Sequence, residues 1–209
     1  MLLATFFPNT TFGWTFYLVL VGLTFVAAVI DWRTMTVPKP LVLVVLVTGL
    51  LMNVVRGAWL GSEGLPLAYL NWTGPAAGAV DGLLFALAGF ATGFALFFVL
   101  WALGTCGGGD VKLFAALGTW LGPLWSIYML VGTWCVVMVG YVLIGYLIHI
   151  LRFGRKPRKQ QVTYSFPIAL SVLVLLLWIL RVDLGIAEWL PQIKKTSAQK
   201  STPAVELQR

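Results

Sequence analysis

Acidic side chains are the groups in this 209-residue chain best suited to chemistry. The chain holds seven Asp and Glu but only one histidine, His149, so it cannot form the His-Glu-x-x-His pair that binds a catalytic zinc ion. No serine lies in a Gly-x-Ser-x-Gly turn. Cys106 and Cys135 lack the spacing of a disulfide framework or a metal site. Paired carboxylates are therefore the hydrolytic chemistry that the composition favours.

Asp31 and Asp110 differ from the other acids because each lies at the end of an apolar segment. Each is followed two residues later by a cation, Arg33 or Lys112. Where such a segment enters a membrane, a carboxylate at that depth is costly and indicates a functional site. The alternative is that both acids are interfacial residues neutralised by the neighbouring cations.

Three glycines, Gly107, Gly108 and Gly109, directly precede Asp110. Glycine permits backbone conformations closed to other residues and allows another chain to approach closely. We therefore expect an extended peptide to lie against this run, beside the acid. A plain flexible turn is the simpler alternative.

The elements that position these residues are predicted to be membrane helices. Hydrophobic residues make up 60% of the chain and charged residues 10%, with a mean hydropathy of +0.93, which excludes a water-soluble domain. Apolar segments cover residues 14–30, 41–55, 79–103, 111–121, 124–150 and 164–180. Helices are expected because an open strand cannot satisfy its backbone in hydrocarbon. The predicted fold is an all-α membrane protein of about six transmembrane helices in one domain, residues 1–190, without a soluble domain. Residues 191–209 form a polar, mobile tail.

The fourth segment is short, since residues 111–121 at about 1.5 Å each cross only about half of a ~30 Å hydrocarbon core. Gly122 and Pro123 predict a turn directly after it. That turn keeps the basic cluster at residues 152–159 on the same side as Arg33 and Lys39. Residues 56–78 are predicted to form the longest loop, and Asp81 to cap the helix that follows.

The net charge of +7 reflects basic residues grouped at the ends of apolar segments. Arg33, Lys39, Lys112 and the cluster at 152–159 fall on one side, so the positive-inside rule places them in the cytoplasm and the N-terminus outside. The basic tail falls outside, against that rule. Membrane lipids are the expected partners of these cations, and nucleic acid is not, because a nucleic-acid site needs a basic face on a polar domain.

Two motifs together resemble one known family. The first is Gly107-Gly108-Gly109-Asp110-Val111-Lys112-Leu113, which resembles the Gly-x-Gly-Asp-x-Lys-Leu signature of type IV prepilin peptidases. The second is Asp31-Trp32-Arg33 followed by Val37-Pro38, which resembles the family's Asp-x-Arg stretch leading to Ile-Pro-Asn. Lys39 replaces the usual Asn of that motif, and Thr163-Tyr164 replaces a frequent Pro-Tyr.

The resemblance implies an aspartic-type endopeptidase of the bacterial inner membrane, with its active site on the cytoplasmic side. Its substrate would be a prepilin, with a short basic leader that is removed and an apolar helix that remains. Asp31 and Asp110 would be catalytic. The glycines at 107–109, with Lys112 and Arg33, would contact the substrate, although the two cations could equally anchor lipid headgroups.

The chain lacks the Cys-x-x-Cys pairs of the larger, bifunctional members. It therefore resembles the minimal peptidases of Flp-type, tight-adherence pili, which implies cleavage without N-methylation. No metal or organic cofactor is implied, and the oligomeric state is left open.

Two neighbouring aspartates cannot easily both ionise, so they would share one proton and divide the roles of base and acid. The sequence does not say which aspartate takes which role. A small ion- or proton-coupled transporter using the same two acids is the main alternative. A non-catalytic partner that binds prepilins is a third.

Overall fold

The computed structural model describes residues 6–34, 36–70, 73–137, 139–140 and 165–183, and within these ranges the chain is helical, without strands. The helices are α1 (Thr10–Thr34), α2 (Lys39–Ser62), α3 (Pro75–Ala102), α4 (Gly108–Val136) and α6 (Ser165–Asp183). His149, the basic cluster at 152–159 and the predicted tail at 191–209 lie outside the described residues.

Four of these helices, α1 to α4, are long and apolar enough to cross a membrane by length and composition, and α6 is a shorter apolar helix. Many large apolar side chains on their surfaces are exposed, as a membrane protein requires; Leu18 and Phe25 on α1 are 63% and 65% exposed. The all-helical prediction is thereby confirmed for the described residues. The count of six spans and the outside N-terminus stay predictions.

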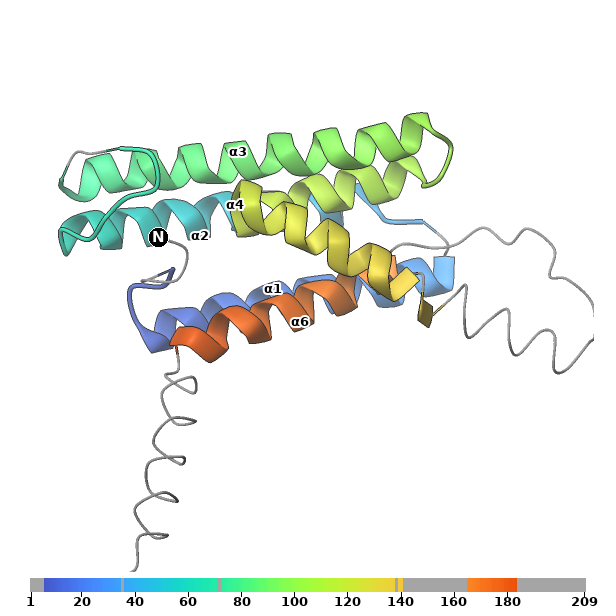
Figure 1. The fold of residues 1–209 in the computed structure, drawn as a ribbon, viewed down its shortest axis with the longest axis horizontal. Coiled ribbons are helices and arrows are strands. Elements are labelled where there is room, and N and C mark those ends of the chain that lie inside the picture. Colours follow the sequence, from blue (N-terminus) through green and yellow to red (C-terminus); the bar gives the residue numbers. More distant parts are fainter. Residues whose placement is uncertain (1–5, 35, 71–72, 138, 141–164, 184–209) are drawn as a thin grey trace, which may run out of the picture.

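The helices form a bundle with α4 at its centre (Figure 1). α2 and α3 pack together on one side, α1 and α6 lie side by side on the other, and α4 contacts α2, α3 and α6. α4 is also the most buried of the four long helices. The helix that begins with the glycine run and Asp110 is therefore the core of the fold.

α2 and α3 pack closely because glycines occupy their interface. A Cβ atom on Gly57 or Gly61 of α2 would collide with the backbone of Gly78 or Gly74, and one on Gly82 would collide with the backbone of α2. Glycines spaced four residues apart lie on one helix face and allow two backbones to touch, which is how apolar helices associate without water. These glycines bring the backbones of α2 and α3 into direct contact.

The turn predicted at Gly122 and Pro123 is present inside α4. Gly122 has a φ of 77° and a ψ of 179°, which interrupts the helix. A Cβ on Gly118 would lie 3.3 Å from the Ser126 hydroxyl, eight residues later, whereas a continuous helix would separate such residues by about 12 Å. The chain therefore turns back, and α4 consists of a first arm, residues 108–121, and a second arm, residues 123–136 (Figure 1).

Asn53 of α2 completes the hydrogen bonding at this turn. Pro123 has no N–H, so the carbonyl of Thr119, four residues earlier, loses its helical donor. The Asn53 amide donates to the Thr119 carbonyl at 2.7 Å and to the Trp120 carbonyl at 3.1 Å, with Asn53 fully buried. The Trp120 indole donates in return to the carbonyl of Val45 at 2.7 Å. α2 thus holds the far end of the first arm.

Asn53→Leu is expected to lower the free energy of unfolding by about 1–3 kcal/mol, because it leaves buried carbonyls of the turn without a donor. The thermal midpoint of the detergent-purified protein measures this loss. Thr48→Val is the matched control, since the Thr48 hydroxyl bonds only to carbonyls of its own helix. Equal midpoints for the two variants would contradict the role given to Asn53.

The predicted cap at Asp81 was wrong. α3 begins at Pro75, so Asp81 lies inside the helix, where it is 2% exposed. Its carboxylate accepts hydrogen bonds from the backbone N–H groups of Ala68, Tyr69 and Leu70 at 2.7–2.9 Å. Asp81 therefore anchors the loop between α2 and α3 and does not cap its own helix.

The predicted loop at 56–78 is also shorter than expected, because α2 continues to Ser62. Arg56 lies inside α2 and is 4% exposed. Its guanidinium lies 4.3 Å and 4.4 Å from the ring centres of Phe6 and Phe85. Cation–π contacts of this kind stabilise a desolvated cation. Arg56 is thus a packing residue of the fold.

Candidate active site

Asp31 and Asp110 lie at the same end of the bundle. Asp31 belongs to the last turn of α1 and Asp110 to the first turn of α4. At this end α1 and α3 finish and α2, α4 and α6 begin (Figure 1). The two side chains are 5% and 9% exposed. The fold therefore places two acids that are far apart in sequence in one buried region.

The carboxyl groups of Asp31 and Asp110 are close enough to interact electrostatically. A buried carboxylate near a second one is costly to ionise, so such a pair tends to share a proton. A shared proton gives one group that can accept a proton and one that can donate it. This is the division that hydrolysis of a peptide bond requires.

Two hydrogen bonds orient the Asp110 carboxylate. The N–H of Gly107 donates to Oδ2 at 3.2 Å, and the Ser165 hydroxyl donates to Oδ1 at 3.4 Å. Gly107 is the N-cap of α4 and Asp110 is the third residue of its first turn, so the first bond is half of a capping box. Each oxygen of Asp110 therefore has a donor from a different part of the chain.

Ser165 was not found by sequence reasoning. It is the first residue of α6 and is 2% exposed. The available signal was its place beside Thr163-Tyr164, as the only hydroxyl in the first turn of the last helix. That signal identifies a helix start, but only the packing of α6 against α4 shows that the hydroxyl meets Asp110.

The glycine run before Asp110 does not adopt unusual dihedral angles. None of the three has a positive φ; in this loop that conformation belongs to Gly104, with a φ of 73°. Gly107 and Gly108 are exposed, and a Cβ on Gly109 would lie 3.8 Å from Val37. The prediction that these glycines are needed for unusual backbone conformations was therefore wrong. Their exposed backbone beside a buried acid agrees with the other prediction, that a second chain can approach closely.

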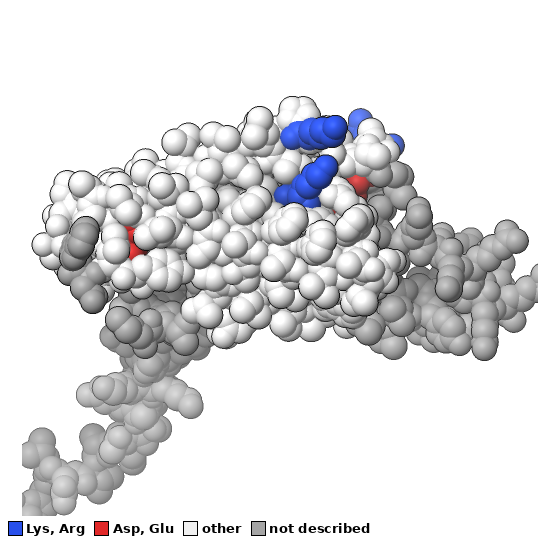
Figure 2. Space-filling model, turned by 90° about the horizontal axis from the view of Figure 1, so that it is seen from above, with Lys and Arg blue, Asp and Glu red and all other residues white. Residues whose placement is uncertain are grey.

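The cations of both motifs lie at this end but face outward. Arg33 and Lys112 are exposed, whereas Asp31 and Asp110 are buried. Side chains two residues apart on a helix diverge, which explains the difference. Figure 2 shows Lys and Arg gathered toward this end of the visible face. Because both cations face outward, they are poorly placed to neutralise the buried aspartates.

Cys106 lies beside the site, in the loop between α3 and α4, with its thiol 3.7 Å from the carbonyl of Phe97. Burial, with a further contribution from the Asp110 carboxylate, raises the pKa of the Cys106 thiol to about 11. The thiol therefore stays protonated at neutral pH and is a poor nucleophile.

We expect Cys106 to react with iodoacetamide at pH 8 about a hundredfold more slowly than a free thiol whose pKa lies near 9, because about a hundred times less of it is ionised. Mass spectrometry of a Cys135→Ala variant, which leaves Cys106 as its single thiol, measures the rate. The rate should rise toward that of the free thiol as the pH approaches 11. Equal rates at pH 8 would contradict this prediction.

Two buried acids lie at one end of a bundle of apolar helices, and the length and composition of those helices indicate a membrane protein. A family model described as the type IV leader peptidase family matches residues 18–144, more than half of the chain. The chain therefore belongs to that family, whose members are peptidases acting on prepilins. Comparisons with curated proteins and with solved structures found no match. The matched range includes Asp31 and Asp110 but ends before Ser165.

Proposed function

We propose that this peptidase is an aspartic-type endopeptidase that removes the short cytoplasmic leader of Flp-like type IV prepilins. The observation that carries the proposal is the pairing of buried Asp31 and Asp110 within a leader peptidase chain. No metal or organic cofactor has a part in this chemistry.

In the proposed reaction the ionised aspartate takes a proton from water as the water oxygen attacks the scissile carbonyl carbon. The protonated aspartate hydrogen-bonds the carbonyl oxygen. Collapse of the tetrahedral intermediate breaks the C–N bond, and the departing amine receives a proton from the pair. Gly107 and Ser165 support this chemistry by keeping the Asp110 carboxylate in one orientation.

The exposed backbone of Gly107 and Gly108 supports a role in holding the leader in extended form beside the acids. Arg33 and Lys112 are ill suited to a basic leader because like charges repel. We assign them to anionic lipid headgroups or to acidic residues of the substrate. We further propose that this end of the bundle lies at the cytoplasmic face of the inner membrane, which the positive-inside rule supports because Arg33 and Lys112 are both here.

The test is co-expression with a Flp-like prepilin, with leader removal followed by the mass of the product. Wild type is expected to cleave, and a variant carrying both Asp31→Asn and Asp110→Asn is expected to fail at an equal membrane level. Asp81→Asn is the matched control, because Asp81 is a buried acid that holds the loop between α2 and α3.

Three outcomes would overturn the proposal. Cleavage by the double variant would remove the aspartates from the chemistry. Failure of wild type with several prepilins, combined with ion flux in vesicles that the double variant lacks, would establish the transporter. Failure of wild type with stable prepilin binding would establish a non-catalytic partner. We also expect a product that lacks the added mass of a methyl group when S-adenosylmethionine is supplied.

A further inference from the structure

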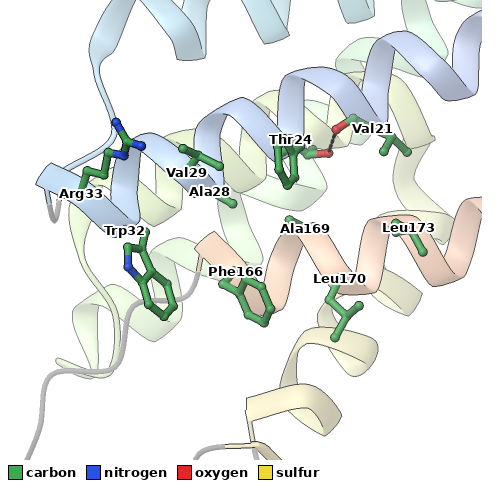
Figure 3. A pocket seen from close by; sticks show the side chains of 11 residues that line it. Val21, Thr24, Ala28, Val29, Trp32, Arg33, Phe166, Ala169, Leu170 and Leu173 are labelled. Carbon is green, nitrogen blue, oxygen red and sulfur yellow. Dashed lines mark hydrogen bonds between the residues drawn. The ribbon is translucent and has the colours of Figure 1, made fainter.

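A groove of about 310 Å³ runs between α1 and α6 on the surface of the bundle. Figure 3 shows side chains from both helices along it, with Trp32 and Phe166 beside each other at one end and Leu173 toward the other. The lining is almost wholly apolar. Arg33 contributes at the Trp32 end, but its guanidinium points away from the groove in Figure 3.

The groove ends at the same end of the bundle as the candidate active site. Trp32 directly follows Asp31 on α1, and Phe166 directly follows Ser165 on α6, where the Ser165 hydroxyl donates to Asp110. On each of the two helices, therefore, a residue that lines the groove is the sequence neighbour of a residue of the site.

The shape of the groove suits a helix. Its floor consists of small or buried side chains, Thr24 and Ala28 of α1 and Ala169 of α6. The Thr24 hydroxyl donates its hydrogen bond to the Leu20 carbonyl of its own helix at 2.8 Å. An occupant of the groove therefore does not have to supply an acceptor for it. Phe25, Val29 and Leu170 form a higher rim. Small floor residues spaced four apart allow a second apolar helix to approach closely.

A second, larger groove of about 620 Å³ lies between the second arm of α4 and α6, lined by residues such as Trp125, Cys135 and Trp178. Its lining includes no residue adjacent in sequence to Asp31, Asp110 or Ser165. Both grooves are apolar enough to take lipid chains, but of the two the first is the one lined by sequence neighbours of Asp31 and Ser165. This difference selects the first groove for the substrate and makes the second a control.

We propose that the α1–α6 groove binds the apolar helix of the prepilin, with the N-terminal end of that helix between Trp32 and Phe166. The proposal rests on the proposed function. Binding there delivers the scissile bond to Asp31 and Asp110, because the leader continues from the helix directly over the site. The groove thus recognises the part of the substrate that is not removed.

The kinetic test uses a substitution that places a larger side chain in the floor of the groove. Ala28→Leu is expected to raise the KM for a full prepilin at least tenfold, and to leave unchanged the cleavage of a short peptide that spans the cleavage point but lacks the helix. Cys135→Leu, in the second groove, is expected to leave both substrates unaffected. An equal loss for both substrates, or no loss with the prepilin, would overturn the proposal.

A crosslinking test does not depend on turnover. A photoreactive amino acid replaces Phe25 at the rim, or Trp178 in the second groove, in an Asp110→Asn background with prepilin present. We expect a prepilin adduct from position 25 and none from position 178. Adducts with lipid alone at position 25 would overturn the groove assignment. Failure of wild type to cleave any substrate would instead refute the proposed function, so the two failures are distinguishable.

Discussion

Asp110→Asn is expected to reduce prepilin cleavage by about a hundredfold to ten-thousandfold while leaving the protein folded, as loss of a general acid or base does. Asparagine has nearly the same shape, and its carbonyl oxygen can accept one of the bonds that Gly107 and Ser165 now donate. What it cannot do is exchange a proton with water or with a leaving amine.

Asp31→Asn is expected to cause a similar loss, and the double variant to be little worse than either single variant, because residues that act as a unit are non-additive. The measurement is kcat/KM with purified protein, accompanied by the thermal midpoint of each variant. Asp81→Asn supplies the comparison for loss of a buried carboxylate elsewhere. Two single losses that multiply in the double variant would show that the aspartates act separately.

Gly122→Ala is expected to lower the free energy of unfolding by about 2–6 kcal/mol. The φ and ψ of Gly122 fall in a region that is occupied almost only by glycine and that costs another residue about 1–3 kcal/mol, and an added carbon in a packed core costs about 1–3 kcal/mol. At Gly122 both penalties apply, since its φ is 77° and a Cβ would collide with the ring of Phe85. The variant should therefore fold poorly or lose the turn between the two arms of α4.

Gly22→Ala is the matched control for this prediction. Gly22 lies in α1 and a Cβ there would meet nothing within 4 Å, so the substitution should be neutral or slightly stabilising, given the better helix propensity of alanine. Thermal midpoints and the yield of monodisperse protein in detergent provide the measurement. If Gly122→Ala and Gly22→Ala behave alike, the turn does not depend on glycine.

The sequence identified those features that depend on local chemistry. The turn at Gly122 and Pro123 was predictable because proline breaks the interior of a helix and the glycine before it can adopt the backbone conformation of a turn. Asp31 and Asp110 were selected because acids at the ends of apolar segments are rare. Their placement at one end of the bundle followed from counting which helix ends share a side.

Features that depend on packing were missed or mistaken. Asp81 was taken for a cap because the apolar segment was judged to begin at residue 79, whereas the helix begins at Pro75 and the acid serves another segment. Ser165 could not be chosen from several serines without knowing that α6 starts beside α4. The burial of Arg56 could not be predicted because it depends on contacts with the rings of Phe6 and Phe85, which lie far from it in sequence.

Asp31 and Asp110 lie on helices with different packing partners. α2, α3 and α4 are joined by glycine contacts and by the bonds of Asn53 and Trp120, and α4 carries Asp110. α1 carries Asp31 and packs mainly on α6. α6 packs on both α1 and α4, and its Ser165 hydroxyl donates to Asp110. The separation of the two acids therefore depends on how α6 packs between α1 and α4.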